Sequence, residues 1–199
     1  VDTLEGQLEY ELILNDIVNL LSFYTLPEES SITNIIGEHS GNVYAVLSEG
    51  MAAAYLDGQW IGTLVDIDIA DAYWMLVNDP PVTLSGTGAN YDSDRVYYLY
   101  AGANLISYPT LTSADLSASI PDEVEDQFVA ILSAGGGALN SDGMWVGSLT
   151  SFDEGLGYWM IVSEDLSFSY ETGSMARTEI RSYVETLPTG SAFQVAQSP

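Results

Sequence analysis

Short runs of apolar residues recur along the chain, separated by turn-forming residues, and this pattern predicts β-strands. Val, Ile, Tyr and Trp dominate the runs, as expected on a half-buried pleated surface. The predicted strands span 10–14, 19–24 and 43–47 in the first half and 96–100, 104–108 and 128–132 in the second. Each series ends with a strand around a single Trp (Trp60 or Trp145) and a strand around a Tyr-Trp pair.

Two segments carry helix signals instead. A proline and polar residues at 27–31 precede the run 32–36, whose isoleucines are spaced for one helix face. Polar residues at 112–115 precede a second such run at 116–120. We expect turns with positive φ at Gly50, Gly58, Gly135, Gly136, Gly137 and Gly143.

The strongest organising signal is an internal repeat. Three blocks return at an offset of 85 residues without any gap: 19–23 onto 104–108, 57–64 onto 142–149, and 72–77 onto 157–162. Chance does not hold one register through three separate blocks, so we infer a tandem duplication. The predicted fold is mainly β (α+β), with two homologous antiparallel barrel- or sandwich-like modules, each with one short helix.

The duplication predicts the domain boundaries. These are an N-terminal strand extension at 1–9, module one at 10–88, a linker at 89–94, module two at 95–173 and a C-terminal extension at 174–199. The polar and glycine-rich stretch 86–94 is expected to be an exposed connector.

Composition excludes several kinds of chemistry. The chain has 29 Asp plus Glu, three Arg and no Lys, giving a formal net charge of −26. It has no Cys and a single His. Lysine-dependent phosphate sites, Schiff bases, thiol chemistry and multi-His metal sites are therefore excluded. Nucleic acid and anionic membranes are poor partners for such a charge, and no apolar run is long enough to predict membrane insertion.

The acidity is not that of a disordered tail, because 47 % of the residues are hydrophobic and can form a core. Carboxylates that coat the surface repel neighbouring copies, and salt or divalent cations weaken that repulsion. We therefore expect an extracellular, salty or calcium-containing environment.

The repeated motifs resemble a known module with the pattern Asn-Leu-(Ile/Val)-Ser-x-Pro, Trp-x-Gly-x-Leu and Gly-Tyr-Trp. Module two matches it at 104–109 and 157–159, whereas module one has Tyr24 for the proline and Ala72 for the glycine. Similar repeats occur in secreted and cell-surface proteins of environmental bacteria and in virion-associated proteins of marine phages. The resemblance implies an extracellular or virion-borne structural or adhesion role and supplies no catalytic residues.

The first functional hypothesis is a non-enzymatic structural protein that binds copies of itself or other surface or virion proteins. Strand-like segments at both ends fall outside the repeat and could add to a neighbour's sheet. Candidate assembly residues are Leu8, Phe193 and Val195, which would fill pockets, and Arg177 and Arg181, which would pair with acidic surface.

The second hypothesis is a carbohydrate- or surface-binding adhesin module. Tyr73, Trp74, Tyr158 and Trp159 could form a platform on which sugar rings stack. Since neighbours in a strand point to opposite faces, one ring of each pair is expected in the core. The other is expected to be exposed or packed on the second module.

Two acidic segments are candidate calcium sites, since alternate loop carboxylates supply the oxygen ligands that calcium prefers. The candidate ligands are Asp66, Asp68 and Asp71 in one segment and Asn90, Asp92 and Asp94 in the other. Neither segment completes an EF-hand, and solvated loop carboxylates are the alternative interpretation. No other cofactor is expected.

A hydrolase is the weakest alternative. His39 lies in a polar turn without a Gly-x-Ser-x-Gly motif elsewhere, so a Ser-His-Asp triad has no support. Paired carboxylates for glycoside hydrolysis are conceivable among so many acids, but no position points to them.

Overall fold

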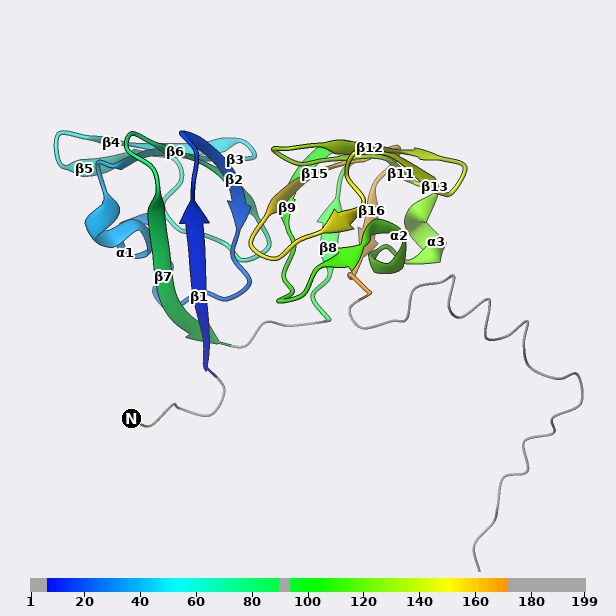
Figure 1. The fold of residues 1–199 in the computed structure, drawn as a ribbon, viewed down its shortest axis with the longest axis horizontal. Helices are drawn as coiled ribbons and strands as arrows, with labels where there is room; N and C mark the ends of the chain where they lie inside the picture. The colour runs from blue at the N-terminus through cyan, green and yellow to red at the C-terminus, as the bar shows by residue number, and fades with distance from the viewer. Residues whose placement is uncertain (1–6, 90–93, 172–199) are drawn as a thin grey trace, which may run out of the picture.

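A computed structural model describes residues 7–89 and 94–171, which form two similar halves (Figure 1). The fold is mainly β, with 52 % strand and 10 % helix. Each half has a five-stranded antiparallel sheet, a two-stranded sheet and a short helix, which confirms the predicted fold class.

The elements of the first half follow one another as β1 (Gln7–Leu14), β2 (Val18–Ser22), α1 (Ile32–Ile36), η1 (Gly37–His39), β3 (Val43–Ser48), β4 (Met51–Leu56), β5 (Gln59–Gly62), β6 (Ala72–Val77) and β7 (Val82–Ala89). Those of the second half are β8 (Tyr97–Leu99), β9 (Gly102–Ser107), β10 (Ala114–Asp115), α2 (Leu116–Ser119), α3 (Asp122–Glu125), β11 (Phe128–Leu132), β12 (Gly137–Ser141), β13 (Met144–Gly147), β14 (Ser151–Phe152), β15 (Gly157–Val162) and β16 (Leu166–Phe168).

The two large sheets have the same strand order. It is β2-β6-β3-β4-β5 in the first half and β9-β15-β11-β12-β13 in the second. These sheets lie along the top of the molecule in Figure 1, and the pairs β1–β7 and β8–β16 lie beneath them. Each half is thus a small sandwich whose core lies between a large and a small sheet.

Alternation along the strands builds the two cores. Tyr73 and Met75 of β6 point down toward Leu12 and Leu84 of the β1–β7 pair, and all four are buried in one cluster. The second core has Tyr158 and Met160 of β15 in the same positions. Its aromatic rings make edge-on and stacked contacts, for example Phe152 against Tyr158 at 4.9 Å between ring centroids.

Both predicted helices are present. Ser31 is the N-cap of α1, and its hydroxyl accepts a hydrogen bond from the Asn34 N–H at 3.3 Å. In the second half, α2 begins at Leu116 as expected, and a further short helix, α3, follows it.

Three local predictions were wrong. No strand was predicted over 51–56 or over 137–141, but these residues form β4 and β12. Residues 86–89, expected in a connector, belong to β7 and pair with β1. Gly86 fits there because the Tyr10 ring covers its Cα, leaving no room for a side chain.

The turn glycines are partly as expected. Asp57-Gly58 and Asp142-Gly143 all have positive φ and form two-residue hairpin loops between β4 and β5 and between β12 and β13. Gly50 also has positive φ, but the glycines of 135–137 do not, so that prediction was wrong.

Candidate functional site

The upper faces of the two large sheets point away from the cores and form an apolar surface without charged residues. Strand register identifies their residues: Leu47 lies opposite Trp74 and Ala52, and Leu139 lies opposite Ala130 and Val146. We call the whole set the outer face. In the first half it comprises Val18, Leu20, Ala45, Leu47, Ala52, Ala54, Leu56, Gln59, Ile61, Trp74 and Leu76. In the second it comprises Ala103, Leu105, Ala130, Leu132, Gly137, Leu139, Ser141, Met144, Val146, Trp159 and Ile161.

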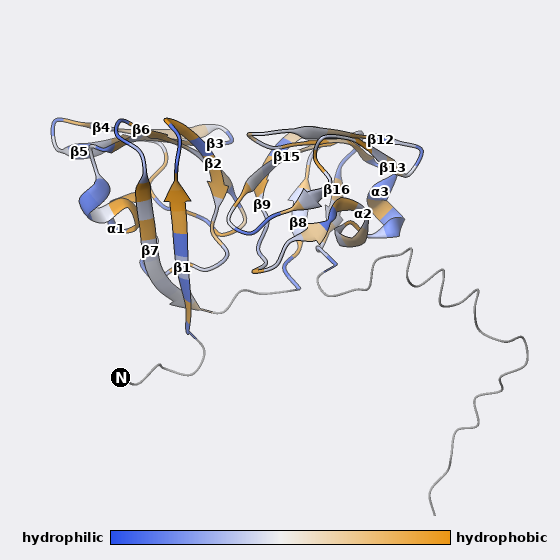
Figure 2. Ribbon diagram, viewed as in Figure 1, coloured by the Kyte–Doolittle hydropathy of each residue, from blue (hydrophilic) through white to orange (hydrophobic). Residues whose placement is uncertain are grey.

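None of these residues is charged, and of those named only Gln59 and Ser141 have polar side chains; Ser22 and Ser107, which continue the same rows at the junction, are fully buried. Several large apolar side chains are well exposed, including Leu139 at 60 %, Met144 at 65 % and Val146 at 59 %. Figure 2 shows apolar stretches along both sheets and hydrophilic residues at the end turns. An uncharged face on a chain with 29 acidic residues is typical of a contact surface.

A small apolar cluster joins the two halves at the middle of the outer face. Leu20 and Ala72 from the first half and Leu105 from the second are buried together, and Trp74 and Trp159 pack against them half-buried. The outer face is therefore continuous across both sheets.

Backbone contacts at this junction come in equivalent pairs. The Ser22 N–H donates to the Gly155 carbonyl at 2.8 Å, and the Ser107 N–H donates to the Ala70 carbonyl at 3.0 Å. Each bond is the image of the other under the 85-residue offset. The bridges Leu21–Leu156 and Asp71–Ile106 are related in the same way.

Such reciprocal contacts define an isologous junction, with the two halves related by a local two-fold axis. The contacts also cover the edge strands β2 and β9, which would otherwise present free backbone groups. Among the described residues, β5 and β13 are the strands of the two large sheets that have an unpaired edge, at the outer ends of these sheets.

Polar side chains at the junction bond to backbone groups. The Ser22 hydroxyl donates to the Leu156 carbonyl at 2.6 Å and accepts from the Tyr108 N–H at 3.3 Å. The Glu49 carboxylate accepts from the Leu105 N–H at 2.9 Å. These bonds satisfy groups that the junction buries, and so hold the halves together.

Glu49 belongs to an acidic group that only the first half has. Burial raises the pKa of the Asp71 carboxyl to about 6, and the charges of Asp68 and Glu49 add to the rise. At the positions equivalent to Glu49 and Asp71, the second half has Ala134 and Leu156.

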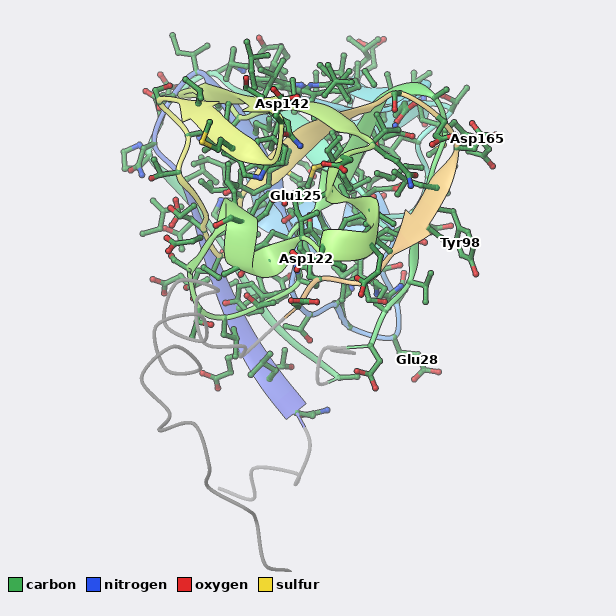
Figure 3. All side chains as sticks on the ribbon, turned by 90° about the vertical axis from the view of Figure 1, so that its right-hand side faces the viewer. Glu28, Tyr98, Asp122, Glu125, Asp142 and Asp165 are labelled. Carbon is green, nitrogen blue, oxygen red and sulfur yellow. The ribbon has the colours of Figure 1, made fainter. Side chains whose placement is uncertain are left out.

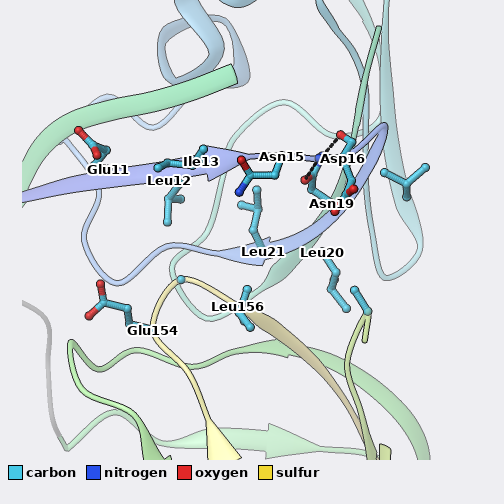
Figure 4. Close-up of a pocket in the computed structure, with 13 residues that line it drawn as sticks. Glu11, Leu12, Ile13, Asn15, Asp16, Asn19, Leu20, Leu21, Glu154 and Leu156 are labelled. Atoms are coloured by element: carbon cyan, nitrogen blue, oxygen red, sulfur yellow. Dashed lines mark hydrogen bonds between the residues drawn. The ribbon is translucent and has the colours of Figure 1, made fainter. Parts of the chain in front are cut away.

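A groove of about 290 Å³ runs beside the junction, between β1–β2 and residues 154–156 (Figure 4). Glu11 and Glu154 lie at one end of it and Asp16 at the other. Asn19 there accepts from the Asp16 N–H and donates to the Asp16 carbonyl, which closes the turn between the two strands. The hydrolase hypothesis stays a prediction.

The Tyr-Trp pairs divide between the two faces as expected. Tyr73 and Tyr158 are fully buried beneath the sheets, and each hydroxyl accepts a backbone N–H at 2.7 Å, from Asp68 and Asp153 respectively. Burial raises the pKa of both tyrosines well above the usual range. They therefore take no part in a sugar platform, and only Trp74 and Trp159 remain for one.

Four of the six calcium candidates, Asp66, Asp68, Asp71 and Asp94, lie within the described residues. Asp66 and Asp68 are exposed, and Asp68 Oδ1 accepts from the Ala70 N–H at 2.8 Å within a turn. Among residues 7–89 and 94–171, no group of three His, Cys, Asp or Glu is arranged to hold a metal ion. Asn90 and Asp92 lie outside the described residues, and Asp94 lies in a turn.

Four of the five candidate assembly residues lie outside the described residues: Arg177, Arg181, Phe193 and Val195. Leu8 is described. It pairs with Gly88 and packs partly buried against the first core, so exchange of this strand would require β1 to leave β7. His39 ends η1, a single 3₁₀ turn.

The outer face was not predicted, although the sequence carries a signal for it. The runs 43–47 and 72–77 are hydrophobic at every position, instead of alternating with polar residues. Runs of this kind are typical of strands with both faces in apolar surroundings.

Comparisons with known proteins add no family to this description. The chain matches no protein-family model, and no similar chain was found among curated proteins or solved structures. In the described part of the chain, no helix is both long and apolar enough to cross a membrane.

Proposed function

We propose that this chain is a non-enzymatic structural protein that assembles with other copies through its outer face. The observation that carries the proposal is that face, which is uncharged and continuous over both sheets. Soluble monomers rarely expose contiguous apolar patches larger than a few hundred Å². An extracellular or virion location, implied by the motif resemblance, belongs to the same proposal.

The area of the face is adequate for assembly. The face has ten strands of four to six residues. With strands about 4.8 Å apart and about 3.3 Å per residue, it measures about 800 Å². Stable protein–protein contacts bury about 800 Å² on each partner.

The distribution of charge also supports this proposal. Carboxylates such as Asp142, at the β12–β13 turn, and Asp165 lie around the outside of the second half (Figure 3). A contact over the outer face would leave them hydrated, so association would not bury unpaired charge. Their mutual repulsion would make association depend on salt.

A pair of lysine variants tests the proposal. Val146→Lys places a charge on the outer face, whereas Tyr98→Lys places one on β8, where the side chain is 74 % exposed and points outward (Figure 3). Both lower the net negative charge equally, so a difference between them cannot come from repulsion. Light scattering should show association weakened at least tenfold by Val146→Lys and unchanged by Tyr98→Lys. Equal association of the two variants would contradict the proposal.

Sugar binding is the second candidate, and one observation favours it. Trp74 and Trp159 lie half-buried near one another on the outer face, where their indoles could stack on a sugar. A glycan-array screen followed by tryptophan fluorescence titration tests this candidate. A glycan that quenches wild-type fluorescence but not that of a Trp74→Ala variant would favour it over assembly.

A further inference from the structure

We infer that the occupant of the outer face is the outer face of a second copy, in a closed two-fold dimer of four stacked modules. This inference rests on the proposed function and goes further by naming the partner, the stoichiometry and the geometry.

The outer face is continuous with the apolar junction between the two halves. The buried cluster of Leu20, Ala72 and Leu105 lies where the local two-fold axis meets the outer face, and Trp74 and Trp159 flank it. The three cluster residues are buried, whereas both indoles keep part of their surface exposed. A second copy centred there would complete the burial of the two indoles.

The outer face is itself two-fold symmetric. Because the halves are related by a local two-fold axis, the outer face presents equivalent residues on both sides of its centre, such as Leu47 and Leu132 or Ile61 and Val146. When two such faces meet about a further two-fold axis, each contact made by one module recurs at the other. Both large sheets of each copy are then covered at once, so the assembly closes at two chains.

The apolar, uncharged character of the outer face limits what can bind to it. It must be flat, apolar and uncharged over about 800 Å², because any carboxylate or ammonium placed on this face would lose its water without gaining a partner. The outer face itself meets these conditions. Two sheets packed face to face lie about 10 Å apart, which the leucine, valine and methionine side chains of this face can fill.

The chain offers a clean probe, because it has no cysteine and a single introduced thiol is unique. Leu139→Cys places the thiol on the outer face, and Tyr98→Cys places it on β8 away from that face. Both native side chains are more than half exposed, so neither variant disturbs a core.

The experiment measures the rate of maleimide labelling and the mass by sedimentation equilibrium, from dilute low-salt to concentrated high-salt solution. We expect the mass to double and then stay constant, while labelling of Leu139→Cys slows at least tenfold and labelling of Tyr98→Cys does not change. Growth beyond two chains, with Leu139→Cys protected, would overturn the inference but leave the proposed function standing. Association with Leu139→Cys still fully reactive, or a chain that stays monomeric throughout, would overturn both.

Discussion

The repeated Trp-x-Gly motif requires glycine for a steric reason. Gly62 and Gly147 have φ near +158°, at the limit of the region that favours glycine, and each lies against the neighbouring strand. A Cβ on Gly147 would overlap the Gly137 carbonyl oxygen, and one on Gly62 would overlap the Ala52 carbonyl oxygen. The glycine of the motif is therefore explained by the close approach of β5 to β4 and of β13 to β12.

Substituting this glycine should therefore be costly. We expect Gly147→Ala to lower the free energy of unfolding by about 2–4 kcal/mol, because backbone atoms must move to admit the Cβ. Gly135→Ala is the matched control, since a Cβ there meets nothing within 4 Å. The control should change stability by less than about 0.5 kcal/mol in urea unfolding. Similar losses for the two variants would contradict the close approach.

The junction between the halves depends on a close contact between strands β6 and β15. Positions 72 and 157 are equivalent in the repeat, and they meet each other across the junction. One is alanine and the other glycine, and a Cβ on Gly157 would overlap the Cβ of Ala72. The repeat has diverged here in the way that a self-contacting position requires, since two methyl groups do not fit.

A swap of these two residues tests the reciprocal geometry. Gly157→Ala alone should lower the free energy of unfolding by about 1–3 kcal/mol through overpacking. The double variant Ala72→Gly, Gly157→Ala should recover most of that loss, because equivalent positions exchange roles about the local axis. Chemical denaturation measures both. A double variant no more stable than Gly157→Ala would show that the two positions are not related by symmetry.

Much of this element-scale picture could be predicted from the sequence. The 85-residue offset predicted two similar halves, and the capping residues before Ile32 and Leu116 predicted where helices begin. The strands β4, β7 and β12 were missed because alanine and glycine have low β-propensity, and tertiary packing overrides it here. Alternation also predicted that one ring of each Tyr-Trp pair lies in the core, but it did not say which; the structure buries Tyr73 and Tyr158 and leaves Trp74 and Trp159 on the outer face.

The outer face could not be assembled from the sequence in the same way. Its residues come from ten strands, and strand order and register, which bring them together, are set by long-range pairing. Local periodicity shows which residues of one strand share a face. It does not show that two large sheets lie side by side with equivalent faces on one surface.

At the scale of the whole molecule, two opposing terms control association. Burial of the apolar side chains of the outer face favours it. Repulsion between two chains of −26 each opposes it. Salt shortens the screening length from about 10 Å at 0.1 M to about 3 Å at 1 M, which removes most of the repulsion but none of the apolar term.

Sedimentation equilibrium of the unmodified chain over this range of salt is the decisive measurement of association. We expect monomers at low salt and a single transition to twice the monomer mass as salt rises. If the chain remained monomeric at millimolar concentration in 1 M salt, the outer face would not be a surface for association between copies.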